Sequence, residues 1–265
     1  MGSAGADRGG RRAAQNGATQ KGTAMIRGLY TSVAGLTAAD ARHQVLAHNL
    51  ANADTPGYKA DDIGIESFEQ VLAALFDPHV PGTGARRGER RFDLTQGGLT
   101  RTGEPLDLAL DGPGFFALTG PDGGPLYTRA GRFHRDANGV LRNADGLAVQ
   151  DENGQPLVAA GATVRVQADG TVVSDGAVVG RLRIVQVDPT TLARAGTVTF
   201  ASTDPNPQPV GARVVSGALE NANVDVTGTM TAMMLLLRAF EVGRQAVQLQ
   251  NETLGATVNQ VGAVR

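Results

Sequence analysis

The sequence predicts an α+β fold in which long N- and C-terminal helices pair as a coiled-coil-like helical domain, with one antiparallel β domain inserted between them. Apolar residues recur at alternating spacings of three and four near both ends of the chain, which is the a/d rhythm of helices that pack side by side. Between the two ends the period changes to two, and turn dipeptides separate short runs. Such patterning predicts an antiparallel sandwich or barrel-like domain.

The two apolar rows define the expected helices, and we call them the N-terminal and C-terminal seams. The N-terminal seam consists of Ile26, Leu29, Val33, Leu36, Asp40, His43, Ala47 and Leu50. The C-terminal seam consists of Met230, Met233, Leu237, Phe240, Arg244, Val247, Asn251, Leu254, Val258 and Val261. We expect their apolar members to make the helix and assembly contacts, and the polar members to weaken the pairing while fixing its register.

The C-terminal segment carries a second apolar stripe beside its seam. The stripe consists of Leu235, Val242, Ala246, Leu249 and Ala256. A helix that is apolar on two faces needs more than one neighbour. Other subunits would supply it; the alternative is that the stripe packs on the β domain.

Four segments follow from these patterns. Residues 1–24 are rich in Gly, Ala and Arg without periodicity and lack the apolar core of a secretory signal peptide, so we expect a disordered extension or a misassigned start. Residues 25–57 and 217–265 should form the paired helices, with Pro56 and Gly57 ending the first. Residues 58–90 read as a linker with a possible short helix, and residues 91–216 as the β domain.

Turn chemistry supports the β prediction. Asn-Gly and Asp-Gly pairs supply the positive φ angles of tight hairpins, and they recur at Asp122-Gly123, Asn138-Gly139, Asp145-Gly146, Asn153-Gly154, Asp169-Gly170 and Asp175-Gly176. On strands of this kind we expect Arg129 and Arg132 to be solvated charges, with subunit contacts as the alternative.

Composition excludes several classes of function. The 265 residues include 36 Gly, no Cys and no Trp, and the net charge is −2. A turn-rich domain fits this composition better than a dense enzyme-like core. The charge gives no pull toward nucleic acid, the missing Cys rules out disulfides and thiolate sites, and no apolar run is long enough to predict a membrane span. Lys occurs only at positions 21 and 59.

No motif for catalysis stands out. The chain has no nucleophile elbow, Walker loop or zinc-protease helix, and neighbouring residues within His134-Arg-Asp136 would point to opposite faces of a strand. Asp136-Ala-Asn138-Gly139 is similar to the start of a calcium loop but lacks the Glu at loop position 12. We therefore predict no catalytic, metal-binding or cofactor-binding residues and no enzyme.

Three stretches carry a resemblance to a known family. The first runs from Ala47 to Lys59 and contains Asn49, Leu50, Ala51, Asn52, Thr55, Gly57 and Tyr58. The second runs from Leu106 to Phe116 and continues at Tyr127–Phe133. The third runs from Ser216 to Asp225, contains Gly217, Leu219, Glu220, Asn223 and Val224, and is followed by Arg238-Ala-Phe-Glu241. Together they resemble the flagellar rod and hook family, the axial proteins of the bacterial flagellum, although His48 and Ala222 depart from the usual Asn and Ser.

The resemblance implies a structural subunit of the flagellar basal-body rod that assembles into a helical axial tube and transmits torque. It implies other rod subunits, copies of itself and the flagellar export apparatus as partners, and export to the periplasm-spanning rod without a cleaved signal peptide. Proximal-rod sequences are the nearer match at 55–61, and a distal rod subunit is the second choice. The alternative from another class is an envelope-binding β-sandwich module with a coiled-coil stalk.

Overall fold

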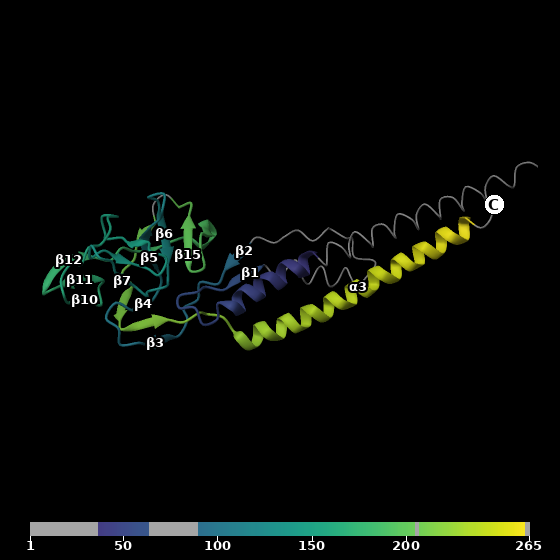
Figure 1. Ribbon diagram of the computed structural model, residues 1–265, viewed down its shortest axis with the longest axis horizontal. Coiled ribbons are helices and arrows are strands. Elements are labelled where there is room, and N and C mark those ends of the chain that lie inside the picture. Colours follow the sequence, from purple (N-terminus) through teal and green to yellow (C-terminus); the bar gives the residue numbers. More distant parts are fainter. Residues whose placement is uncertain (1–36, 64–89, 205–206, 263–265) are drawn as a thin grey trace, which may run out of the picture. The chain divides into compact units, whose positions relative to one another are not determined.

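The computed structural model describes residues 37–63, 90–204 and 207–262 (Figure 1). The chain divides into two compact units. The first contains Met1–Ala47, Ile63–Arg90 and Met230–Arg265, and the second, which we call the β unit, contains His48–Asp62 and Arg91–Thr229. Most of the described secondary structure is in short strands of the β unit.

The largest sheet of the β unit has nine strands joined by antiparallel pairing. Its members are β5 (Phe115–Thr119), β6 (Pro125–Thr128), β7 (His134–Arg135), β8 (Leu141–Arg142), β9 (Ala148–Val149), β13 (Ile184–Gln186), β14 (Leu192–Arg194), β15 (Thr199–Ser202) and β16 (Gln208–Pro209). Strand β5 is central, since β6 pairs with one of its sides while β13 and β9 share the other. A single 3-10 turn, η1 (Pro189–Thr191), precedes β14.

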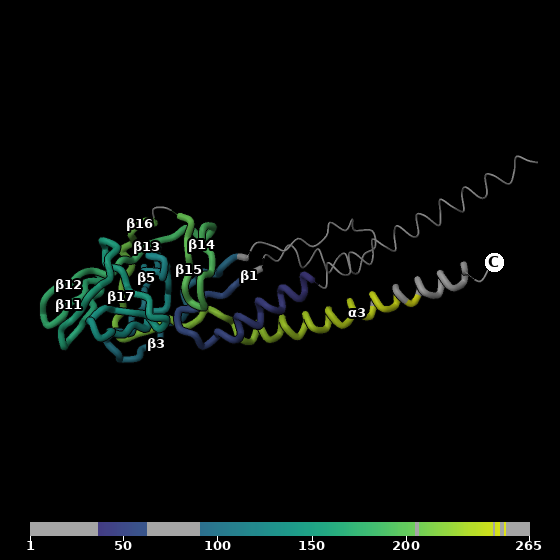
Figure 2. Tube along the Cα trace, turned by 45° about the horizontal axis from the view of Figure 1, so that its top comes forward, coloured from purple at the N-terminus to yellow at the C-terminus, as the bar shows by residue number. Residues whose placement is uncertain are grey.

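The remaining strands form small sheets. A three-stranded sheet contains β10 (Val164–Val166), β11 (Thr171–Ser174) and β12 (Ala177–Arg181). The two-stranded pairs are β1 (Asp61–Ile63) with β2 (Arg90–Phe92), β17 (Arg213–Ser216) with β4 (Leu108–Asp111), and β18 (Ala218–Glu220) with β3 (Leu99–Arg101). Within the β unit, β11 and β12 lie at one end and β14 and β15 at the other (Figure 2).

Turn glycines have the conformation that the sequence predicts. Gly123, Gly139, Gly146, Gly154 and Gly176 all have φ between 77° and 87°. This is the left-handed region, which a residue without a Cβ enters at little cost. The dipeptide signal therefore identified these turns correctly.

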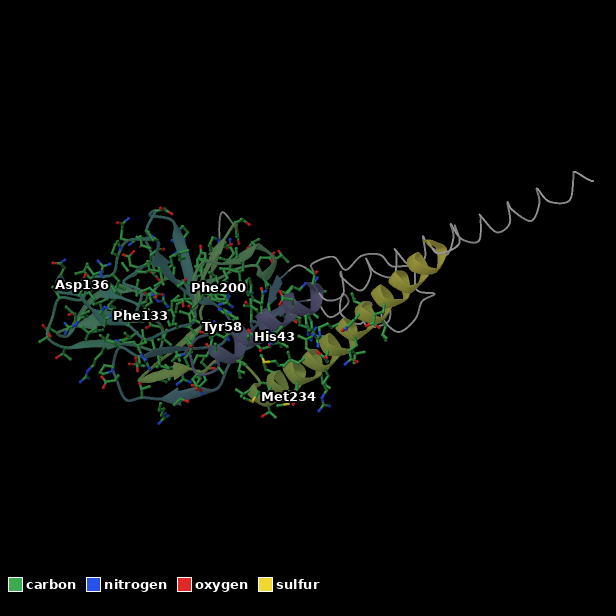
Figure 3. All side chains as sticks on the ribbon, turned by 45° about the vertical axis from the view of Figure 1, so that its right-hand side comes forward. His43, Tyr58, Phe133, Asp136, Phe200 and Met234 are labelled. Carbon is green, nitrogen blue, oxygen red and sulfur yellow. The ribbon has the colours of Figure 1, made fainter. Side chains whose placement is uncertain are left out.

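Apolar side chains of the β unit gather in two clusters. The larger contains Phe116, Phe133, Leu141 and Leu182, and the smaller contains Phe115, Tyr127, Val185 and Phe200. Phe115 and Phe116 follow one another on β5, so alternation along the strand places them in different clusters. Phe133 and Phe200 lie inside the β unit, whereas Asp136 lies at its surface (Figure 3). Packing within these clusters holds in place the strands that carry the polar residues of the candidate site.

The predicted pair of long terminal helices is wrong. The first helix is described only over residues 37–51. Among the described side chains of α3 (Val226–Gly262), Leu236 is buried but most of the large apolar ones are exposed, so they do not form a buried coiled-coil seam. Met234 is 64% exposed and Leu237 is 53% exposed, and Met234 projects outward from α3 (Figure 3). The a/d rhythm reports which faces of a helix are apolar. It does not report what covers those faces, and this is why the fold prediction failed.

Candidate functional site

A fixed turn follows the first helix. The backbone N–H of Asn52 donates to the Asn49 carbonyl at 3.1 Å, and that of Thr55 donates to the Asn52 carbonyl at 3.0 Å. The Asn52 side chain donates to the His48 carbonyl at 2.8 Å, and the Thr55 hydroxyl donates to the Asn52 side-chain oxygen at 3.3 Å. Carbonyls released at the end of the helix thus find partners within the motif.

Gly57 brings this turn close to the backbone of two other segments of the β unit. Its φ is +72°, and its N–H donates to the Glu220 carbonyl at 2.7 Å. A Cβ at this position would lie 2.2 Å from the backbone nitrogen of Ala130. Only glycine tolerates both the positive φ and this approach of two backbones.

Asn49 fixes the chain that returns from the turn. Its side-chain oxygen accepts from the Asp61 N–H and from the Tyr58 hydroxyl, both at 2.9 Å, while its Nδ2 donates to the Asp61 carbonyl at 2.8 Å. The Tyr58 hydroxyl also lies 2.8 Å from His48 Nδ1. Asn49 is 6% exposed and Tyr58 is fully buried. The Asn49 side-chain amide therefore gives the buried backbone N–H and C=O of Asp61 the hydrogen bonds that water would otherwise supply.

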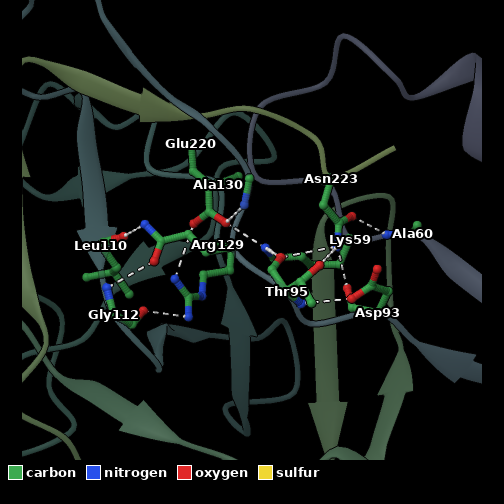
Figure 4. Close-up of polar contacts among 12 residues, drawn as sticks. Lys59, Ala60, Asp93, Thr95, Leu110, Gly112, Arg129, Ala130, Glu220 and Asn223 are labelled. Atoms are coloured by element: carbon green, nitrogen blue, oxygen red, sulfur yellow. Dashed lines mark hydrogen bonds and ion pairs between the residues drawn. The ribbon is translucent and has the colours of Figure 1, made fainter. Parts of the chain in front are cut away.

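A buried ionic cluster joins the two sequence motifs (Figure 4). Lys59 Nζ lies 2.5 Å from Glu220 Oε1 and donates to the Thr95 carbonyl at 2.5 Å. Arg129 Nη1 donates to Glu220 Oε2 at 3.2 Å, and its Nη2 donates to the Gly112 carbonyl at 2.9 Å. The side chains of Lys59 and Glu220 are 0% exposed and that of Arg129 is 4% exposed. Residues 161 positions apart are therefore held by a charge pair without water.

Burial dominates the electrostatics of the two cations. Burial lowers the pKa of the Lys59 ammonium below its usual 10.5, while the hydrogen bond and charge of Glu220 oppose that change. Burial also lowers the pKa of the Arg129 guanidinium, again opposed by Glu220. One carboxylate thus faces two cations, and backbone carbonyls stabilise the excess positive charge.

Asn223 closes the same junction from the C-terminal motif. Its side-chain oxygen accepts from the Ala60 N–H at 2.8 Å, and its Nδ2 donates to the Asp93 carbonyl at 2.8 Å and to the Thr95 carbonyl at 3.1 Å. The Glu220 carboxylate also accepts a hydrogen bond from the Gly97 N–H at 3.0 Å. Residues 93–97 are therefore clamped between the two motifs.

Arg194 on β14 anchors the other side of the turn. Its Nε and Nη2 lie 3.0 and 2.6 Å from Asp61 Oδ1, and Nη2 also donates to the Lys59 carbonyl at 2.6 Å. The guanidinium lies 4.8 Å from the centre of the Tyr58 ring and 5.0 Å from that of Phe200. Arg suits this position because its planar guanidinium can form an ion pair and stack on aromatic rings at the same time.

The cluster holds the chain together and is not arranged for a reaction. A lysine with a lowered pKa is a familiar catalytic group, but Lys59 is fully buried and its Nζ is engaged by Thr95 and Glu220. Within the described residues, no group of three or more His, Cys, Asp or Glu side chains could hold a metal ion. The described part of the chain also contains no helix long and apolar enough to cross a membrane.

The structure brings five of the predicted motif residues into one junction: Asn49, Gly57, Tyr58, Glu220 and Asn223. Asn52 and Thr55 support the turn, and Leu219 is 3% exposed beside Glu220. Gly217 donates its N–H to the Asp107 carbonyl at 2.8 Å. Leu50 and Val224 are half-buried and Ala51 is exposed, and none of these three contributes a side chain to the polar contacts.

Sequence reasoning missed or misjudged four charged residues of the junction. Arg129 was expected to be a solvated strand charge and is instead buried; Arg132 is exposed, as expected. Lys59 was named as the last residue of the first motif but was given no structural role, and Asp61 and Arg194 were given none either. Lys59 did carry a signal, since it is one of two Lys residues in a chain with 24 basic residues.

The seam residues lie outside this junction. Met230 is 48% exposed and Phe240 is 40% exposed, while Met233 and Val247 are half-buried. Ile26, Leu29, Val33 and Leu36 lie outside the described residues, and so do the side chains of Leu254 and Val258. The described seam on α3 thus presents apolar surface.

Comparisons with known proteins match the same segments. Residues 29–59 match the family described as "Flagella basal body rod protein", and residues 215–261 match "Flagellar basal body rod FlgEFG protein C-terminal". Residues 109–178 match "Flagellar hook protein FlgE/F/G D1 domain". A flagellar basal-body rod protein FlgF of Caulobacter vibrioides is 33% identical over 231 residues, which cover 83% of this chain and 91% of that one. The chain belongs to the flagellar basal-body rod protein family.

Other relatives carry the same description. The FlgF rod protein of Escherichia coli is 30% identical over 252 residues, covering 87% of this chain and 96% of that one. The FlgG rod protein of Bacillus subtilis is 28% identical over 271 residues, covering 89% and 99%. The chain is thus a structural rod subunit of the flagellar basal body, as its sequence motifs predicted. The family matches at both ends contain Asn49, Gly57, Lys59, Glu220 and Asn223 of the buried junction, and the middle match contains Arg129.

Proposed function

We propose that this chain is a proximal subunit of the flagellar rod, which assembles with other rod subunits and with copies of itself into a helical tube that transmits torque. The observation that carries the proposal is the apolar surface of α3. Leu235, Leu237, Val242 and Leu249 are between 49% and 64% exposed on one helix. Leu235, Val242 and Leu249 recur at intervals of seven residues and so lie along one face of the helix, while Leu237 lies on another face. Exposed apolar surface of this kind marks a site where another protein binds. The flagellar export apparatus would deliver the subunit.

The buried junction would serve this function mechanically. Torque passing along a rod strains each of its subunits. Within the β unit, the segment that follows the first helix is tied to the C-terminal motif and to β14 by the buried pairs that Lys59, Arg129 and Arg194 form with Glu220 and Asp61. Buried ion pairs that also bond to backbone carbonyls stiffen the segments that they join. We therefore propose that the junction keeps the β unit rigid under load.

A pair of neighbouring substitutions on α3 tests the assembly proposal. Leu249→Asp places a charge on the apolar surface, whereas Gln248→Asp places the same charge at an exposed polar position of the same turn. Each variant is expressed in a strain from which the gene is deleted. We expect swimming and complete basal bodies with Gln248→Asp and neither with Leu249→Asp. Normal swimming and normal rods with Leu249→Asp would refute the assembly surface, and both in the deletion strain would refute the function.

Position along the rod separates the proximal from the distal subunit. Gold labelling of an epitope tag on purified basal bodies should place the chain on the side of the rod nearest the inner membrane. Label confined to the hook end would favour the distal alternative.

A further inference from the structure

A pocket of about 550 Å³ opens on the β unit, apart from the buried junction. Residues of three segments line it, among them Glu104, Leu106, Asp107, Phe133, Arg135 and Val164. Phe133 is 5% exposed and Val164 is 8% exposed, so its apolar wall belongs to the packed core. Its polar residues include two carboxylates.

Asp107 is the unusual group in this pocket. It is only 7% exposed, and its backbone is fully engaged: its N–H donates to the Glu104 carbonyl at 3.1 Å, and its carbonyl accepts from Gly217 at 2.8 Å and Ala218 at 3.2 Å. Among the described residues 37–63, 90–204 and 207–262, no hydrogen bond or ion pair engages its carboxylate, whose oxygens are not fully enclosed and so open into the pocket. A carboxylate that is largely removed from water and has no counter-charge costs the fold free energy.

The nearby cations do not satisfy Asp107. Arg135, which also lines the pocket, donates to the carbonyls of Gly161 and Ala159 and forms no ion pair with Asp107 among the described residues. Arg132 is the β-bridge partner of Asp107, but its exposed side chain forms no ion pair with it within the described residues. His134 is exposed. The pocket therefore offers an unused negative charge at its base and a second carboxylate, Glu104, at its rim.

We propose that this pocket binds an arginine side chain presented by another protein chain. A cation would relieve the unpaired Asp107 carboxylate, and a guanidinium is less strongly hydrated than an ammonium and so enters a partly apolar pocket more readily. Its aliphatic stem would pack on Leu106 and Val164, as the stems of long basic side chains do on apolar surface. In the proposed rod, a neighbouring subunit would present the arginine. Only this choice of partner chain rests on the proposed function.

Binding is measured on the isolated full chain with a small probe, so the result does not depend on rod assembly. N-acetylarginine methylamide is titrated into the isotope-labelled chain, with shifts followed for residues 104–107, 133–135 and 162–164. The matched control probe is N-acetylcitrulline methylamide, which has nearly the same shape but no charge. We expect saturable shifts at these residues with the arginine probe and at least tenfold weaker binding of the citrulline probe.

Substitutions give a second, independent readout. Asp107→Asn keeps the shape and should weaken the arginine probe about tenfold or more, while raising the melting temperature of the free chain by about 2 °C or more, because an unpaired buried charge is removed. Glu104→Gln at the exposed rim should weaken the probe by less than about threefold. Equal binding of the two probes, or unchanged binding in Asp107→Asn, would overturn the proposal. So would a lower melting temperature of Asp107→Asn, which would mean that the carboxylate has an internal partner such as Arg132.

Discussion

Replacing Glu220 by Gln should destabilise the β unit strongly. The carboxylate accepts from Lys59 at 2.5 Å, from Gly97 at 3.0 Å and from Arg129 at 3.2 Å. The neutral amide keeps the shape, and its oxygen in the place of Oε1 can still accept from Gly97 and Lys59. Its NH2 group in the place of Oε2 cannot accept from Arg129, and a hydrogen bond to a charged group contributes about 1.5–3 kcal/mol. It also leaves two buried cations without a counter-charge. Removing one partner of a buried pair costs roughly 3–5 kcal/mol.

The assay is thermal and urea unfolding of the isolated chain. With about 2–4 °C per kcal/mol for a unit of this size, the melting temperature should fall by roughly 6–20 °C. The control is Glu152→Gln, which removes an ion pair with Arg181 of similar length, 3.3 Å, but with the two side chains 46% and 59% exposed. An exposed pair contributes about 0–1 kcal/mol. Adding Lys59→Met to Glu220→Gln should restore part of the stability, because one uncompensated cation is removed.

A small effect would refute this reasoning. If Glu220→Gln unfolds within about 1 kcal/mol of the parent chain, as the exposed control does, the cluster must be solvated and cannot act as the dry connection described here. The same conclusion would follow if the double variant were no more stable than Glu220→Gln alone.

Two further predictions concern the turn and the lysine. Gly57→Ala should destabilise the chain far more than Gly146→Ala: both have φ above +70°, but a Cβ at Gly57 meets the Ala130 backbone at 2.2 Å and one at Gly146 meets nothing within 4 Å. Urea midpoints measure the difference, and equal losses would contradict the close approach. For Lys59, the unfolded chain holds its proton up to 10.5 while burial lowers the folded pKa, so the unfolding free energy of the parent minus that of Lys59→Met should rise with pH between the folded pKa and 10.5. A difference that falls with pH across this window would contradict a lowered pKa.

The buried junction changes how the two end motifs are understood. Asn49 and Gly57 read as helix-exit residues when taken one at a time, and Asn223 as a motif residue near the other end of the chain. In the structure Asn49 binds the backbone of Asp61, while Gly57 and Asn223 make backbone contacts across the chain, with Glu220 and Ala60. Together with Lys59 and Glu220 they tie segments from opposite ends of the chain to residues 93–97. The family motifs are therefore joined in space, which their separation in sequence conceals.

Local chemistry explains what could be predicted. Asn-Gly and Asp-Gly pairs identified the turns, because only residues that tolerate positive φ fit there. Period-two alternation identified the strand-rich region, because successive side chains point to opposite faces. The partners of a charged side chain are not local: Arg194 reaches Asp61 across 133 positions, and nothing in the pattern around Arg129 distinguishes a buried cation from a solvated one.

The sequence by itself determined the family, the turns and the apolar faces of α3, since each depends on residue types at short spacings. The tertiary structure alone decided that Lys59, Arg129 and Glu220 share one cluster shielded from solvent, and that the Asp107 carboxylate lines a pocket without a partner among the described residues. It also overturned the predicted pairing of the terminal helices. The physical reason is the same in each case: periodicity states what a face is made of, whereas burial and pairing depend on which distant segment comes to lie against it.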